Sequence, residues 1–324
     1  MHLNKNFEKS VENYTEHKLP NQWIDTLIQQ KYFKLFVPKS LGGLELTLLE
    51  GTKKLIETAQ IHGGLGWVHN LGAGANYFCG FFDEKTANEL FSAPDTILSG
   101  SGFNSGTVQS KDSCYIINGA WSKCSGADHA SHFTFNAVNE KGETNSYIIS
   151  KEKVSLTPSW SSFGLKSSSS HSITIKNQSI PKEYLFEIGK QQSFSNYTIY
   201  CVPFEQFARI CLSATFQGMT ESLLNAFKKL DKVPLNVNIN KAEEQIQILN
   251  NNRNQLAEYY DSTIDFSNQV LKESVNELGI IHAQLFETLM QLYLKGGMTV
   301  TEESNLIHWQ IRDIMTAIQH YMLK

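Results

Sequence analysis

The order of segment types along the chain is the feature that most limits its fold. Residues 115–186 are rich in Ser, Thr and Ile and alternate as strands do, whereas the segments before and after have helical apolar spacing. Helices, one β module and helices again are an uncommon order. We therefore predict an α+β protein with an N-terminal α-helical domain (1–94), a middle β domain (95–188) and a C-terminal helical bundle (189–324).

Apolar periodicity and turn residues predict the individual elements. Asp83 is the expected N-cap of a short helix. The predicted N-terminal helices cover 20–36, 45–61, 64–82 and 84–91. The predicted strands of a β-barrel-like module cover 115–119, 132–138, 146–149 and 172–175. A bundle of four helices is predicted at 204–230, 241–275, 277–294 and 302–322, with 231–240 as a loop.

Composition and charge argue against several classes of function. Hydrophobic residues at 41% and charged residues at 19% are typical of a globular protein. A net charge of -4 provides no basic stripe, so we expect neither nucleic acid nor a membrane as partner. The most apolar window, 64–82, is interrupted by polar residues and predicts a buried helix. Five scattered cysteines without Cys-x-x-Cys, and no signal-peptide pattern at the N-terminus, favour a cytoplasmic protein.

Four short motifs carry the functional information. Residues 118–126 read NGAWSKCSG and residues 160–170 read WSSFGLKSSSS, both within the β module. Residues 35–43 read LFVPKSLGG in the N-terminal part, and Arg312-Asp313 is followed by His320 near the C-terminus. Together these motifs resemble the acyl-CoA dehydrogenase superfamily along nearly the whole chain, and they are closest to its two-component flavin-dependent monooxygenase branch.

The resemblance implies a flavin beside the β module. In the family, the hydroxyl that matches Ser125 lies close to flavin N5 and O4, and Trp121 belongs to the strand pair against the flavin. Ser101 or its neighbour Ser99 would contact flavin or substrate. Without the resemblance, a Trp and a Ser on one strand would indicate ordinary packing and a satisfied hydroxyl.

A serine run takes the place of a glycine-rich loop of the family. Ser168 and Ser170 fall in this loop, which in the family approaches the flavin or its phosphate. Ser167 and Ser169 replace glycines, and glycine is the residue that permits close backbone approach. The run by itself would indicate a flexible surface loop, so phosphate binding there is an open question.

The last predicted helix carries the residue expected to act on the substrate. Its isoleucines form one stripe, and Asp313 and His320 fall on the opposite face, which by pattern alone would be solvated. The resemblance implies instead that His320 points to the substrate as a base or hydrogen-bond partner, a task that suits a pKa near neutrality. We expect Asp313 to contact substrate too. In phenol-hydroxylating relatives a second histidine lies on the helix of Trp67, which makes His69 and Asn76 candidates.

The expected function is monooxygenation of a small organic substrate, with aromatic compounds among the options. By resemblance, reduced FMN or FAD would come from a separate flavin reductase, and the chain would form a homotetramer. An acyl-CoA dehydrogenase with a relocated base is the first alternative, although no glutamate stands nine residues after Arg312-Asp313 and no Arg-x-x-Phe-Gly occurs. A non-catalytic family member is the second. We expect no metal, because His129 and His132 lack a third ligand.

Overall fold

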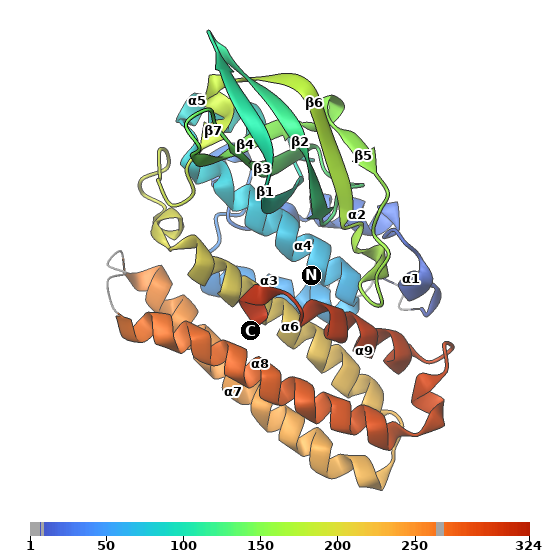
Figure 1. The fold of residues 1–324 in the computed structure, drawn as a ribbon. Helices are drawn as coiled ribbons and strands as arrows, with labels where there is room; N and C mark the ends of the chain where they lie inside the picture. Colours follow the sequence, from blue (N-terminus) through green and yellow to red (C-terminus); the bar gives the residue numbers. More distant parts are fainter. Residues whose placement is uncertain (1–6, 8–9, 264–268) are drawn as a thin grey trace.

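The computed structural model describes residue 7, residues 10–263 and residues 269–324, and it confirms the predicted α+β fold class (Figure 1). The sheet lies at one end of the molecule, with α4 directly against it, α3 and α6 in the middle and the α7–α8 hairpin at the far end. The helices are α1 (Glu12–Thr15), α2 (Asn21–Gln29), α3 (Leu48–Ile61), α4 (Gly63–Asn76), α5 (Glu84–Phe91), α6 (Phe204–Lys228), α7 (Asn236–Ser262), α8 (Gln269–Gly296) and α9 (Leu306–Ala317). The strands are β1 (Leu98–Lys111), β2 (Cys114–Cys124), β3 (His132–Val138), β4 (Thr144–Ser150), β5 (Ser155–Thr157), β6 (His171–Pro181) and β7 (Leu185–Phe186).

Local capping explains where the N-terminal helices begin and end. Thr47 and Glu50 form a capping box at α3, and Asp83 accepts two backbone N–H groups at α5, as predicted. The first predicted helix is too long, because Lys31 adopts a left-handed conformation with φ 58° and α2 ends at Gln29. The helix predicted at 64–82 is α4 followed by a 3-10 segment, Tyr77–Phe81.

The predicted β module is one seven-stranded sheet with the order β5-β6-β2-β1-β3-β4-β7. Neighbouring strands are antiparallel except β1 and β3, which are parallel. The sequence prediction missed β1, β5 and the two-residue β7 entirely. β1 reads LSGSGFNSGTVQSK, and its middle is exposed and rich in Ser and Gly, so it lacks the apolar alternation typical of a strand.

Trp121 is the central packing residue of the sheet. Its indole is fully buried, and its N–H donates to the carbonyl of Asn136 at 2.8 Å. The ring lies across Gly106 and Gly119, which are paired on β1 and β2. A Cβ at either glycine would come within 2.6 Å of the indole. The Gly-x-Trp motif is therefore explained by packing.

Gly119→Ala should destabilise the protein by about 1–3 kcal/mol, because the added methyl group would meet Gly106 and the Trp121 ring. Chemical denaturation measures the change in the free energy of unfolding. Gly102→Ala on β1 is the matched control, since a Cβ there would meet nothing within 4 Å. Equal losses from the two substitutions would show that Trp121 is not tightly packed.

The C-terminal helices surround α6, which packs against α3, α7, α8 and α9. The prediction of one helix at 241–275 is wrong in extent, since α7 begins at Asn236 and ends at Ser262; its part at 264–268 lies outside the described residues. The short α9 lies on α6 and touches α4 (Figure 1). Helices from both ends of the chain share one hydrophobic core, and the sheet has a second. In the described part of the chain, no helix is long and apolar enough to cross a membrane.

Candidate functional site

A chain of three serine hydroxyls lies where β2 ends. Ser125 directly follows β2, and its Oγ accepts a hydrogen bond of 3.2 Å from Trp67 Nε1 on α4. The Oγ of Ser170 lies 2.8 Å from that of Ser125 and 2.8 Å from that of Ser168. The structure thus brings together Ser125, Ser168 and Ser170, three of the predicted site residues, and adds Trp67, which the sequence placed only on a cavity-lining helix.

Backbone hydrogen bonds fix the serine loop, residues 164–170, to the turn after β2. Gly126 N donates to Ser168 O at 2.8 Å and Ala127 N donates to Ser169 O at 3.2 Å. Ser99 donates its hydroxyl to the carbonyl of Ser125 at 2.7 Å. All four serines of the run are at most 4% exposed. The alternative of a flexible surface loop is therefore wrong.

Ser169 shows how a serine replaces a glycine in this loop. Its φ of 47° lies in the left-handed region that favours glycine. Its hydroxyl donates to Asp128 Oδ2 at 2.8 Å, and the same oxygen lies 3.6 Å from His171 Nε2. His171 Nδ1 accepts the backbone N–H groups of Ser159 and Trp160, both at 3.2 Å. Asp128 and His171 support the loop, and no sequence signal had singled them out.

His320 lies beside Trp67, with ring centroids 5.7 Å apart at an interplanar angle of 71°. It is half-buried, and burial lowers its pKa below the usual value, so the ring is neutral at neutral pH. Met322 N donates to Nδ1 over 3.4 Å, which places the proton of the neutral ring on Nε2. No described residue binds Nε2. His320 therefore presents an N–H group rather than a free lone pair.

Asp313 is buried between α9, the serine loop and the start of α4. Its Oδ1 accepts the Leu165 N–H at 2.6 Å, whereas Oδ2 has no hydrogen-bond partner among the described residues. Oδ2 faces a cavity of about 10 Å³ lined by Tyr14, Ala59, Gly63, Met219, Ser222 and Gln310. Desolvation raises the pKa of Asp313 to about 7. At 6% exposure it offers little surface to a substrate, contrary to what the sequence suggested.

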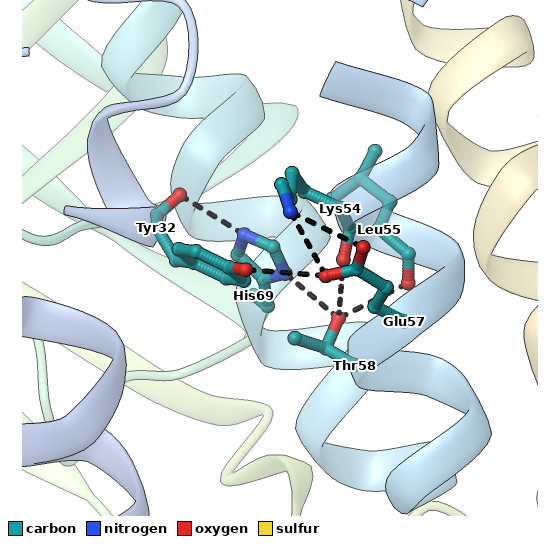
Figure 2. A network of polar contacts seen from close by, with 6 residues as sticks. All are labelled: Tyr32, Lys54, Leu55, Glu57, Thr58 and His69. Carbon is teal, nitrogen blue, oxygen red and sulfur yellow. Dashed lines mark hydrogen bonds and ion pairs between the residues drawn. The ribbon is translucent and has the colours of Figure 1, made fainter. Parts of the chain in front are cut away.

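His69 is fully enclosed in the polar network of Figure 2. Its Nε2 donates to the Tyr32 carbonyl at 2.9 Å, because a carbonyl can only accept, and its Nδ1 then accepts from the Thr58 hydroxyl at 2.8 Å. Burial lowers the pKa of His69 to about 3. Asn76 is also fully buried and donates to the carbonyls of Phe33 and Thr96. Both side chains form hydrogen bonds inside the core around α4, and neither has surface that a substrate could contact.

In the described part of the chain, no hydrogen bond joins the remaining candidates to the three serine hydroxyls. Trp121 is enclosed in the sheet and presents no surface to a cofactor. Ser101 is half-buried on β1 and accepts the Phe103 N–H at 3.5 Å. His129 lies in the turn before β3, and His132 Nδ1 lies 3.1 Å from the hydroxyl of Ser131. Within residues 10–263 and 269–324 no group of three or more His, Cys, Asp or Glu side chains is arranged to hold a metal.

The pKa of Asp313 predicts a pH-dependent stability. Because its folded pKa of about 7 exceeds the ordinary 3.8, the folded protein loses stability as pH rises from about 4 to about 7. Asp313→Asn removes that loss. The variant should therefore gain on the order of 2–3 kcal/mol in free energy of unfolding, relative to wild type, between pH 5 and pH 8.

Denaturation at the two pH values measures this gain. The described groups that interact electrostatically with Asp313 are Arg312 on α9 and Tyr14 on α1, and the substitution leaves both in place. Asp112→Asn, in the exposed turn between β1 and β2, is the control and should leave the pH profile unchanged. A pH-independent difference between Asp313→Asn and wild type would contradict the raised pKa.

The chain is similar in sequence to oxygenase components of flavin-dependent monooxygenases. The chain is 28% identical over 173 residues to the oxygenase subunit HsaA of a flavin-dependent monooxygenase from Mycobacterium tuberculosis, covering 51% of this chain and 43% of that protein. It is 25% identical over 225 residues to the oxygenase component of p-hydroxyphenylacetate 3-hydroxylase from Acinetobacter baumannii, covering 65% and 53% of the two chains. The matches thus span about half the length of these relatives. No protein-family model matches the chain.

Solved structures establish the fold. XiaF from Streptomyces sp., in complex with FADH2 and glycerol, superposes with a TM-score of 0.87 at 18% identity, over 97% of this chain and 87% of XiaF. TdsC from Paenibacillus sp. A11-2, in complex with FMN and indole, gives a TM-score of 0.80 at 15% identity, over 93% and 86%. The chain has the acyl-CoA dehydrogenase-like fold of the two-component flavin-dependent monooxygenases, and the resemblance seen in the sequence is confirmed.

Proposed function

We propose that this chain is the oxygenase component of a two-component flavin-dependent monooxygenase that acts on a small aromatic substrate. The observation that carries the proposal is the half-buried Ser125 hydroxyl at the end of β2, held by Trp67 and Ser170, with His320 next to Trp67. The relatives with known activities, HsaA and p-hydroxyphenylacetate 3-hydroxylase, are oxygenase components that support the same reaction class.

The donor set at Ser125 fits the polar edge of a flavin ring. A hydroxyl has one donor and two acceptor positions. When Ser168 donates to Ser170 and Ser170 donates to Ser125, the Ser125 oxygen accepts twice, from Ser170 and Trp67. Its own proton is then free to bind an acceptor such as flavin N5. Bound reduced flavin would supply the chemistry, which is activation of dioxygen and transfer of one oxygen atom.

His320 would orient the substrate and stabilise its ionised form. Its Nε2–H can donate to a phenolate oxygen, and the phenolate is the electron-rich form of the ring that reacts with an electrophilic oxygen. To serve as a base, the ring would have to expose its Nε2 lone pair and move its proton to Nδ1, which faces the Met322 N–H. The geometry thus favours the hydrogen-bond partner of the two roles that the sequence left open.

Several wider features belong to the same proposal. A separate flavin reductase would supply reduced FMN or FAD, and both cofactors have precedent, since XiaF binds FADH2 and TdsC binds FMN. A homotetramer is supported by the largely exposed apolar side chains at the end of the α7–α8 hairpin, Val233, Val237, Leu294 and Met298. The scattered free cysteines support a cytoplasmic location.

The purified protein should bind reduced flavin and slow the oxidation of that flavin by dioxygen. Reduced FMN and reduced FAD are each titrated into the protein under anaerobic conditions, with Trp fluorescence as the signal. The titrations should show saturable binding and reveal which flavin binds more tightly. After mixing with oxygen, protein-bound flavin should reoxidise in more than one spectral phase, and ¹⁸O₂ with p-hydroxyphenylacetate or indole should yield a product carrying one labelled oxygen.

Two outcomes would redirect the assignment. Tight binding of oxidised FAD that acyl-CoA thioesters bleach would identify a dehydrogenase. Failure to bind either flavin in either redox state would indicate a non-catalytic relative.

Substitutions at His320 separate the two roles of this residue. His320→Ala should lower coupled product formation by about 10–100-fold, while flavin binding changes little, because the lost group faces the substrate. His320→Gln, whose amide N–H can take the place of Nε2–H, should restore a large part of the activity. Product formed per oxygen consumed is the measurement. A Gln variant as inactive as Ala, with wild-type flavin binding, would favour a base instead.

A further inference from the structure

The backbone around Leu165 is held from three sides. Its N–H donates to Asp313 Oδ1 at 2.6 Å, and its carbonyl accepts from Trp160 Nε1 at 2.8 Å and from Ser168 N at 3.1 Å. Leu165 adopts a left-handed conformation with φ 50°, which for a leucine persists only when its surroundings enforce it. The Asp313 contact spans 148 residues of chain and ties α9 to the serine loop.

The loop and α9 also meet without intervening side chains. A Cβ added at Gly164 would lie 2.0 Å from the Arg312 carbonyl oxygen, so only glycine fits there. At the start of α4, a Cβ at Gly63 would lie 2.4 Å from Asp313 Oδ2, and one at Gly64 would lie 2.3 Å from Ser167 Oγ. The start of α4, the serine loop and α9 therefore share one close-packed junction centred on Asp313.

The junction connects directly to the serine chain. The 3-10 segment Lys166–Ser168 begins after Leu165, and Ser168 then accepts from Gly126 N through its carbonyl and meets Ser170 through its hydroxyl. A shift at Leu165 would therefore move Ser168, and with it the Ser170 hydroxyl that contacts Ser125.

We propose that Asp313 is a positioning residue of the flavin site: by accepting the Leu165 N–H, it holds the serine loop so that Ser168 and Ser170 orient the Ser125 hydroxyl. This role rests on the proposed function for its connection to flavin. It differs from the substrate contact that the sequence suggested, since Asp313 acts through Leu165 and touches neither substrate nor cofactor.

The experiment compares three variants of the full chain. Asp313→Ala removes the acceptor, and Asp313→Asn keeps an oxygen at the place of Oδ1. Gln310→Ala is the matched control, because Gln310 is buried one turn earlier on α9, borders the same small cavity and bonds Ser222 rather than the loop. Hydrogen exchange of the peptide covering residues 160–170 and titration with FMN or FAD are measured on each.

Asp313→Ala should lose exchange protection at residues 164–170 and bind flavin about tenfold or more weakly above pH 7, where the lost hydrogen bond to a buried N–H is charge-assisted. Asp313→Asn should stay within about threefold of wild-type affinity. Gln310→Ala should keep both protection and affinity despite a lower unfolding temperature. If Asp313→Ala does not fold, Gly164→Ala, which pushes the loop off α9 while Asp313 stays, should weaken flavin binding in the same way.

Wild-type exchange protection and affinity in Asp313→Ala would overturn the proposal, as would equal loss of affinity in Gln310→Ala. Loss of loop protection without loss of affinity would overturn the link to Ser125. A wild-type protein that binds no flavin would remove the proposed function itself, and hydrogen exchange, which needs no flavin, would still decide whether Asp313 holds the loop.

Discussion

The stability of the serine loop depends on the hydrogen bonds that its buried polar groups make. Burying a hydroxyl or an amide without a hydrogen bond costs about 1–3 kcal/mol, so a run of four serines with almost no exposed surface would otherwise be unstable. The turn after β2 binds two of the loop carbonyls, and Asp128 and Asp313 accept from Ser169 and Leu165. The site geometry around Ser125 follows from this requirement.

The same requirement explains why the site carries features that oppose stability. Ser169 and Leu165 adopt left-handed conformations, and Asp313 is a carboxylate in a desolvated junction. Each feature has a local cost, and each is over-determined by its surroundings, as is common where function fixes the geometry. A neutral acceptor at position 313 would cost less, but it would accept the Leu165 N–H less strongly.

The periodicity of the sequence predicted the structural features that depend on neighbouring residues. It missed the features that depend on residues far away in the chain. The approximate positions of most helices, the Asp83 cap and the β3 and β4 strands follow from local patterns and agree with the structure, although several helix ends do not. β1 was missed because its exposed Ser/Gly-rich middle lacks alternation. The family motifs located Ser125 and the serine loop. The partners that make this loop ordered, above all Asp313 on α9, are far away in sequence, and no spacing rule connects them.

The C-terminal segment that begins with α9 contacts both groups that bind the Ser125 hydroxyl, directly or through the serine loop. α9 carries Asp313, which reaches Ser125 through the serine loop, and its continuation carries His320, which lies against Trp67, the other partner of Ser125. The hydroxyl that would bind flavin and the N–H that would bind substrate are therefore positioned by the same short helix. In a monooxygenase, the transferred oxygen atom has to travel from the flavin to one carbon of the substrate, so the relative placement of these two groups matters more than the position of either. Because α9 holds the serine loop and leads directly into His320, one segment fixes that placement, whereas two independent loops would not.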